Sequence, residues 1–161
     1  LVGENGAGKS TLMKVLSGAV KADRGDLRLD GEAYRPGNPL HARRQGVAMI
    51  YQELSLAPHL TVEENIMLGM EPARGGWIDR AQVRRTAAEA LRHFDRPDIQ
   101  PNTPVGKLSV AAQQLVEIAR ALAIGCRVLV LDEPTSSLTQ RDVQRLFSLI
   151  EKLKGQGIAV V

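Results

Sequence analysis

Apolar residues recur along this chain at two spacings, one typical of helices and the other typical of strands. Spacings of three and four residues place side chains on one face of a helix, whereas short alternating or continuous apolar runs are typical of strands. The helical spacing predicts helices over 9–17, 61–68, 79–94, 109–123 and 142–154. The strand patterns lie over 1–2, 27–29, 47–51, 128–131 and 158–161.

Polar residues mark the boundaries of several predicted elements. Thr61 and Glu64 fit a capping box, and Asp79 and Ser109 are suited to begin the helices that follow them. Asp30-Gly31 predicts a hairpin turn after the strand pattern that precedes it. In the last helix the spacing predicts a set of residues that face the core: Val143, Leu146, Phe147, Ile150 and Leu153.

The alternation of strands and helices favours an α/β fold with a mainly parallel sheet and helices on its faces. The stretch 53–123 contains no convincing strand, so we interpret it as a helical insertion. The predicted organisation is one domain, with an α/β core over 1–52 and 124–161 and a helical subdomain over 53–123. Both chain ends fall in strand patterns, whose buried backbone groups need partners, so we expect a domain that is truncated at both ends.

Composition narrows the possible functions. The net charge is +3 and the basic residues are scattered, which argues against nucleic-acid binding, where basic residues usually cluster. Cys126 is the only cysteine, so no internal disulfide can form, and we expect it to pack before a strand. No apolar run reaches the roughly 18 residues that a membrane-spanning helix needs. A role in transport would therefore require a separate membrane partner.

One segment matches the phosphate-binding loop pattern of nucleotide-binding proteins in full: Gly3-Glu4-Asn5-Gly6-Ala7-Gly8-Lys9-Ser10. Its glycines allow a tight turn whose N–H groups point into one concavity, and the helix that follows presents its positive end to the same anion. Lys9 can reach the β- and γ-phosphates, Ser10 can ligate Mg²⁺, and Thr11 can donate to a phosphate. The segment therefore predicts a nucleotide site.

Two acidic residues follow the apolar run 128–131. Open α/β sheets bind ligands beyond the carboxyl ends of their strands, which is where Asp132 and Glu133 are expected. Asp132 can join the Mg²⁺ shell. Glu133, one residue further, faces elsewhere and can polarise an attacking water. The alternative, a solvated acidic turn before Pro134, is less favoured beside a phosphate-binding loop.

Taken together, these motifs resemble those of the nucleotide-binding domains of ABC transporters, which are P-loop NTPases with a RecA-like core. The phosphate-binding loop matches the family's Walker A motif and the run that ends at Glu133 matches its Walker B motif. Three further matches follow the family order: Tyr51-Gln52-Glu53 for the Q-loop, 108–114 for the signature, and Ser136-Ser137-Leu138-Thr139 for the D-loop. The resemblance covers essentially the whole chain.

The resemblance implies a composite site, in which ATP lies between the phosphate loop of one domain and the signature helix of a second ATPase domain. The helix after Ser109 would then offer its N–H groups to the γ-phosphate. Gln52 would sense Mg²⁺ and the attacking water. The helical insertion would dock on a cytoplasmic loop of transmembrane permease subunits. Leu54, Leu56 and Leu60 are candidates for that contact, although core packing explains them equally well.

Within the family, the chain is most similar to the ATPases of bacterial importers for ribose, galactose and xylose. That similarity implies ATP hydrolysis that drives carbohydrate uptake, on the cytoplasmic face of the bacterial inner membrane as a peripheral subunit. A periplasmic sugar-binding protein would be an indirect partner. Such ATPases usually carry two ATPase domains in one chain, and this sequence resembles the first.

Several features depart from the family pattern. Val110, Ala111 and Ala112 stand where the signature has Gly, Gly and Gln, which predicts reduced activity at the site it completes. The family's adenine-stacking aromatic and switch histidine would lie outside this sequence, and Trp77 is expected to pack in the helical region. Two alternatives stay open: a soluble ABC-type ATPase of translation or DNA repair, and a non-catalytic module that responds to ATP.

Overall fold

The computed structural model describes residues 7–94, 96–136 and 138–161. Its helices are α1 (Lys9–Leu16), α2 (Pro39–Arg44), α3 (Val62–Met67), α4 (Arg80–Leu91), α5 (Val110–Ala123) and α6 (Gln140–Gly155), with a 3-10 turn over Val105–Lys107. Its strands are β1 (Arg28–Leu29), β2 (Glu32–Ala33), β3 (Val47–Ile50), β4 (Ala73–Arg74), β5 (Trp77–Ile78), β6 (Val128–Leu131) and β7 (Ala159–Val160). Among the helices of the described residues, none combines the length and apolar character that crossing a bilayer requires.

The central sheet is parallel, as the alternation of strands and helices predicts. Its strand order is β3-β6-β7, with Val47 opposite Val128 and Ile50 opposite Leu131. Strand β7 pairs with the other edge of β6. Because helices cover both faces of the sheet, its middle strand is a continuous apolar run in which Leu129 and Val130 are fully buried.

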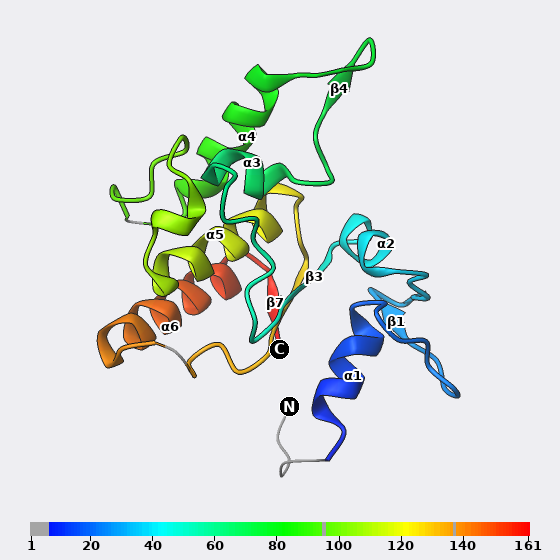
Figure 1. The fold of residues 1–161 in the computed structure, drawn as a ribbon. Coiled ribbons are helices and arrows are strands. Elements are labelled where there is room, and N and C mark those ends of the chain that lie inside the picture. The colour runs from blue at the N-terminus through cyan, green and yellow to red at the C-terminus, as the bar shows by residue number, and fades with distance from the viewer. Residues whose placement is uncertain (1–6, 95, 137) are drawn as a thin grey trace.

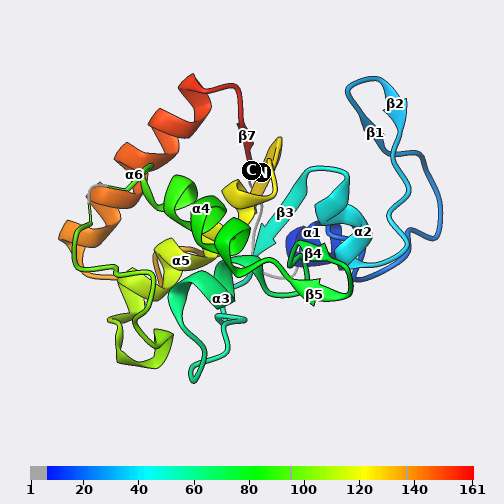
Figure 2. The ribbon, with the colours of Figure 1, turned by 90° about the horizontal axis from the view of Figure 1, so that it is seen from above.

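The two faces of β6 pack against different helices. Leu129 and Leu131 face a cluster built with α5 and α6, whereas Val130 faces Met13 of α1 and Ala42 of α2. This alternation follows from the two-residue period of a strand. Figures 1 and 2 show α5 and α6 on one side of the strands and α1 and α2 on the other.

A second apolar cluster joins α3, α4 and α5. It contains Val62 and Ile66 of α3, Val83 of α4 and Val116 of α5, which are all buried. Helix α5 is shared, because its residue Ile118 belongs to the sheet cluster instead. The region between β3 and β6 is thus mainly helical and is packed on the sheet through α5 (Figure 1).

The predicted helix starts are confirmed by their hydrogen bonds. Thr61 and Glu64 form both bonds of the capping box, since Thr61 N donates to Glu64 Oε2 at 2.9 Å and Glu64 N donates to Thr61 Oγ1 at 3.4 Å. Asp79 and Ser109 also accept backbone N–H groups at the starts of α4 and α5. The Asp30-Gly31 turn joins β1 to β2, with a positive φ at both residues.

Two predictions about elements are wrong, and one helix was missed. The stretch 53–123 does contain strands, because β4 and β5 form a short antiparallel hairpin around Gly75-Gly76, a dipeptide that favours such turns. Helix α2 was not expected, although Asn38 caps it and Pro39 begins it. Helix α6 begins at Gln140 rather than Asp142, because Thr139 caps it.

Two predictions about side-chain burial are also wrong. Phe147 is 55% exposed on α6, and Leu149 takes a buried position on the core face of that helix. Trp77 is 82% exposed, because the β4–β5 hairpin projects from the helical region instead of packing within it. Cys126 is buried before β6, as expected, and burial raises the pKa of its thiol to about 11.

Candidate functional site

The start of α1 carries the described part of the phosphate-binding loop. Gly3, Glu4, Asn5 and Gly6 lie outside the described residues, so the description begins with exposed Ala7. Gly8 precedes the helix with a φ of 84°, and a Cβ built there would meet nothing within 4 Å. Backbone conformation, rather than space, is therefore what favours glycine at this position.

Beyond Gly8, the polar residues at the start of α1 are accessible. Ser10 and Thr11 are exposed and Lys9 is half-buried. The helix begins in regular geometry, since Leu12 N donates to Gly8 O at 2.9 Å. The first turn of α1 therefore leaves two hydroxyl side chains exposed next to a lysine.

The predicted carboxylates lie where β6 ends. Asp132 is half-buried and its N–H donates to Ile50 O of β3 at 3.0 Å. Glu133 is exposed, with a left-handed φ of 47° that is uncommon for any residue other than glycine. The backbone therefore turns sharply at Glu133, directly after the strand end that carries Asp132.

Parallel pairing brings Gln52 to the same edge of the sheet. Ile50 lies opposite Leu131, so exposed Gln52 and the two carboxylates all follow paired strand ends. In Figure 1 the start of α1 lies on the side of the molecule at which β3 and β7 end. The hydroxyl, carboxylate and amide oxygens of Ser10, Asp132 and Gln52 are the hard ligands that Mg²⁺ prefers, so this donor set fits that ion.

This set of oxygen donors differs from a metal site in which protein side chains supply all the ligands. Within 7–94, 96–136 and 138–161, no three His, Cys, Asp or Glu residues gather in a way that could hold a metal ion. Mg²⁺ usually binds proteins through one or two carboxylates and completes its shell with water and substrate phosphates.

Ser109 caps the start of α5. It is exposed, and its hydroxyl accepts the N–H of Ala112 at 3.3 Å. Val110 is 48% exposed, whereas Ala112 is buried. Val110 therefore adds a bulky side chain at the surface, at a position where the family signature has glycine. Ala112 does not add bulk at the surface, because it is buried.

Helix α5 also contacts the turn that carries the carboxylates. The Gln114 side chain, which is buried, donates to Pro134 O at 2.7 Å, and Pro134 directly follows Glu133. Gln114 falls in the signature range 108–114, but no role for its side chain was predicted. A buried amide on an apolar helix face is the signal that could have identified it, because such a group needs a partner.

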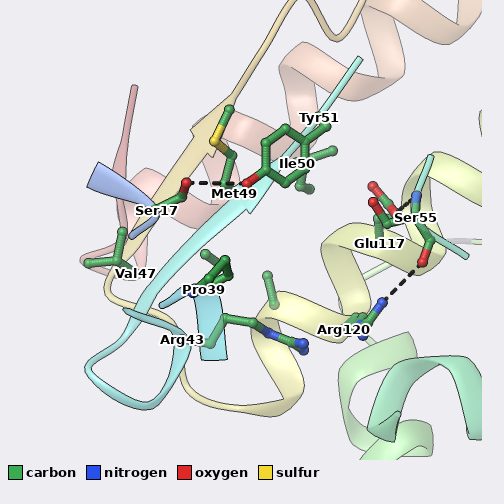
Figure 3. A pocket seen from close by; sticks show the side chains of 12 residues that line it. Ser17, Pro39, Arg43, Val47, Met49, Ile50, Tyr51, Ser55, Glu117 and Arg120 are labelled. Atoms are coloured by element: carbon green, nitrogen blue, oxygen red, sulfur yellow. Dashed lines mark hydrogen bonds between the residues drawn. The ribbon is translucent and has the colours of Figure 1, made fainter. Parts of the chain in front are cut away.

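A charged cluster lies next to the segment that follows β3, and sequence reasoning did not anticipate it. Arg43 of α2 and Glu117 and Arg120 of α5 line a cavity of about 210 Å³ together with Tyr51 and Ser55 (Figure 3). Burial raises the pKa of Glu117, and the two arginines oppose that rise. Burial, with the nearby charge of Arg120, lowers the pKa of Arg43 to about 10.

Comparisons with known proteins identify the family of this chain. Residues 1–136 match the family described as ABC transporter. The ribose import ATP-binding protein RbsA of Chromobacterium violaceum is 50% identical over 161 residues, and RbsA 1 of Burkholderia ambifaria is 53% identical over 166 residues. Both matches cover 100% of this chain but 32% of the relative, so the chain spans about a third of the length of these curated relatives.

Solved structures give the same fold. The ADP conformation of MJ1267, an ATP-binding cassette of an ABC transporter, superimposes with a TM-score of 0.82 at 26% identity, over 99% of this chain and 66% of that one. The dimeric ATP-binding cassette MJ0796, bound to ADP and Pi after hydrolysis, gives a TM-score of 0.74 at 26% identity, over 98% of this chain and 70% of that one.

Proposed function

Because the chain belongs to the ABC transporter family, we propose that it is an ATP-binding region of a bacterial importer in which ATP hydrolysis drives the uptake of a monosaccharide. The likeness of the whole of this chain to part of two ribose import ATP-binding proteins supports a sugar as the cargo. The same likeness to import ATP-binding proteins supports a place as a peripheral subunit on the cytoplasmic face of the inner membrane.

One observation carries the proposal: parallel pairing of β3 with β6 places Gln52, Asp132 and Glu133 beyond paired strand ends. In the proposed site, Lys9 and the backbone amides from Gly3 to Thr11 bind the phosphates of ATP. Ser10, Gln52 and Asp132 hold Mg²⁺, which when bound neutralises the charge that develops on the phosphates.

Glu133 acts on the attacking water in this proposal. The carboxylate accepts a proton as the water oxygen bonds to the γ-phosphorus, and the bond from that phosphorus to the bridging oxygen of ADP breaks. Gln52 orients the same water. Phosphoryl transfer depends mainly on positioning and charge, so a rigid strand end is a suitable place for these side chains.

A second ATPase domain completes the site. Helix α5 is 14 residues long, so its first turn offers N–H groups and a positive dipole end to the γ-phosphate bound by the other domain. Ser109 lies exposed at that end. The dimeric cassette MJ0796 supports such a pairing. Val110, exposed where the signature has glycine, is expected to slow hydrolysis at the site to which this helix contributes.

The other proposed partners are transmembrane permease subunits and, indirectly, a periplasmic sugar-binding protein. We assign the α/β core to 1–52 and 124–161 and the helical subdomain, which contacts the permease, to 53–123. Leu54, Leu56 and Leu60 are half-buried, and Leu56 packs against the helical cluster, so core packing accounts for Leu56. Leu54 and Leu60 stay as candidates for the permease contact.

The proposal is tested on the intact protein, assembled with its permease in proteoliposomes. We expect ATP hydrolysis together with ATP-dependent uptake of labelled ribose, galactose or xylose, and we expect Lys9→Ala to abolish both. The matched control is Lys154→Ala, which removes an exposed lysine that pairs with Glu151 on α6. ATP binding without hydrolysis would contradict the proposal and favour a module that only responds to ATP.

A further inference from the structure

We infer that Glu117 and Arg120 of α5 are positioning residues for turnover, because they hold the segment that carries Gln52. This inference rests on the proposed function, in which Gln52 contacts Mg²⁺ and the attacking water. Neither residue lies at the edge of the sheet where the chemistry is proposed. They act through the backbone of Ser55, three residues beyond Gln52 (Figure 3).

Both backbone polar groups of Ser55 are bound by these charged side chains. Ser55 N donates to Glu117 Oε1 at 2.6 Å, and Arg120 Nη1 donates to Ser55 O at 3.4 Å. Arg120 Nη2 also donates to Leu68 O, beyond α3, at 3.3 Å. Glu117 and Arg120 are three residues apart on a helix, so they present neighbouring side chains to the same backbone segment.

The segment around Gln52 is held at two further points. On one side, the hydroxyl groups of Tyr51 and Ser17 lie 3.2 Å apart in a hydrogen bond. On the other side, the fully buried Asn65 side chain accepts the N–H of Ala57 at 2.8 Å and donates to its carbonyl at 3.0 Å. Exposed Gln52 therefore lies between fixed positions, and Ser55 is the one that connects it to α5.

Burying a carboxylate at position 117 has a free-energy cost. Glu117 is 7% exposed and burial disfavours its ionised form, whereas the Ser55 N–H and the two arginines favour that form. Replacing a whole buried ion pair by well-packed apolar residues is often neutral or stabilising, but removing one partner leaves the other charge buried without compensation. Glu117 accepts a hydrogen bond from Ser55, which lies 62 residues earlier in the chain. We therefore infer that this bond is present because it fixes the conformation of the loop that contains Ser55.

The arrangement also links two parts of the proposed machinery. Helix α5 begins at Ser109, which would contact the nucleotide of a second domain, and Glu117 lies about two turns further along. A rotation of α5 would carry the carboxylate with it and so displace Ser55 and Gln52. Turnover is thus expected to depend on the bond between Glu117 and Ser55.

The experiment compares Glu117→Ala, Glu117→Gln and the control Val116→Ala in the intact protein with its permease. Val116 is fully buried next to Glu117 and packs in the helical cluster, so its truncation weakens the same helix without touching Ser55. Three quantities are measured: the amide hydrogen exchange of segment 52–56, and the kcat and the KM for ATP hydrolysis in excess Mg²⁺.

We expect Glu117→Ala to speed exchange at Ser55 and to lower kcat about 10- to 100-fold, the usual effect of losing a residue that orients a metal ligand. KM is expected to change little, because the lost interaction acts on the transition state. Glu117→Gln keeps an acceptor for Ser55 N–H and should recover most of the exchange protection and part of kcat. Val116→Ala should leave both the amide exchange of segment 52–56 and kcat unchanged.

Unchanged exchange at Ser55 in Glu117→Ala, or fast exchange with wild-type kcat, would overturn the inference while leaving the proposed function intact. An equal loss of kcat in Val116→Ala would also overturn it. If wild-type protein shows no ATP hydrolysis, the proposed function fails and this inference fails with it. Should Glu117→Ala not fold, Glu117→Gln and Arg120→Lys are compared with the wild type instead. Arg120→Lys is expected to lower kcat, because a lysine lacks the planar fork with which Arg120 binds the carbonyls of Ser55 and Leu68 together.

Discussion

At the scale of single residues, the backbone of Glu133 is the most unusual feature of the candidate site. Its φ of 47° lies in the left-handed region, and the only other described residue outside glycine with a positive φ is Asp30 in a hairpin turn. Such conformations carry a free-energy cost of about 1 kcal/mol or more and persist where the surrounding structure enforces them. Here the turn directly follows the middle strand of the sheet.

We predict that Glu133→Gln keeps ATP affinity and loses turnover. Glutamine has the same shape and the same backbone cost, but it cannot accept a proton, so kcat should fall about 100-fold or more. ATP binding and hydrolysis in the intact protein measure the two effects. Glu151→Gln, an exposed change on α6, is the control and should keep full activity. Hydrolysis at the wild-type rate in Glu133→Gln would remove this residue from its proposed role.

A second residue-scale prediction concerns the capping box and pH. The backbone and hydroxyl of Thr61 donate to the Glu64 carboxylate and lower its pKa below the usual 4.5. The resulting stability is fully present above pH 4.5 and is lost as the pH falls through the lower pKa of the folded state. Urea unfolding should therefore give a difference between wild type and Glu64→Gln that shrinks from pH 7 to pH 3. A difference that is constant with pH would contradict this assignment.

At the scale of elements, the sequence predicted long amphipathic helices better than short elements. Helices α4, α5 and α6 have apolar stripes several turns long, so their spacing is visible. Helix α2 has six residues and β4 and β5 have two each, which is too short for any period to be read. The exposed positions of Phe147 and Trp77 depend on where α6 and the hairpin meet their neighbours, and no local pattern contains that information.

The β4–β5 hairpin gives an element-scale prediction through Trp77. Because its indole is 82% exposed, its fluorescence should resemble that of indole in water and should be quenched readily by iodide. In a longer protein with further tryptophans, the difference between the fluorescence spectra of the wild type and Trp77→Phe gives the contribution of Trp77. A blue-shifted component that resists iodide would show instead that the hairpin is covered, either by the rest of the chain or by a partner.

At the scale of the whole molecule, the sheet with its helices and the helical region have separate apolar clusters that meet through α5. The sequence predicted that Asp132 and Glu133 lie beyond the end of a buried strand, because open α/β sheets bind ligands at that edge. The place of Gln52 at the same edge was not predicted from the pattern of strands. The sequence also did not predict the cluster of Arg43, Glu117 and Ser55. Those three residues come from α2, α5 and the loop after β3, and their meeting depends on how the two regions pack.

The same packing predicts an asymmetry in stability between two apolar residues. Leu129 is fully buried in the middle strand, so Leu129→Ala should lower the free energy of unfolding by about 2–5 kcal/mol through lost contacts and a cavity. Phe147 is larger but 55% exposed, so Phe147→Ala should change it by about 0.5 kcal/mol or less. Denaturant unfolding measures both. A large loss for Phe147→Ala would indicate that α6 has a covered outer face in the intact protein.

The order of strands in the sheet has a consequence for how the protein is made. Val47 of β3 pairs with Val128 of β6, which is translated 81 residues later. At about 5–20 residues per second, a nascent β3 waits roughly 4 to 16 s for its neighbour to be synthesised. Helices α3 and α4 emerge during that interval. Until α5 follows and completes their cluster, they can pack only on each other. The newborn chain therefore carries an unpaired apolar strand for seconds, and this strand is where a chaperone would be expected to bind.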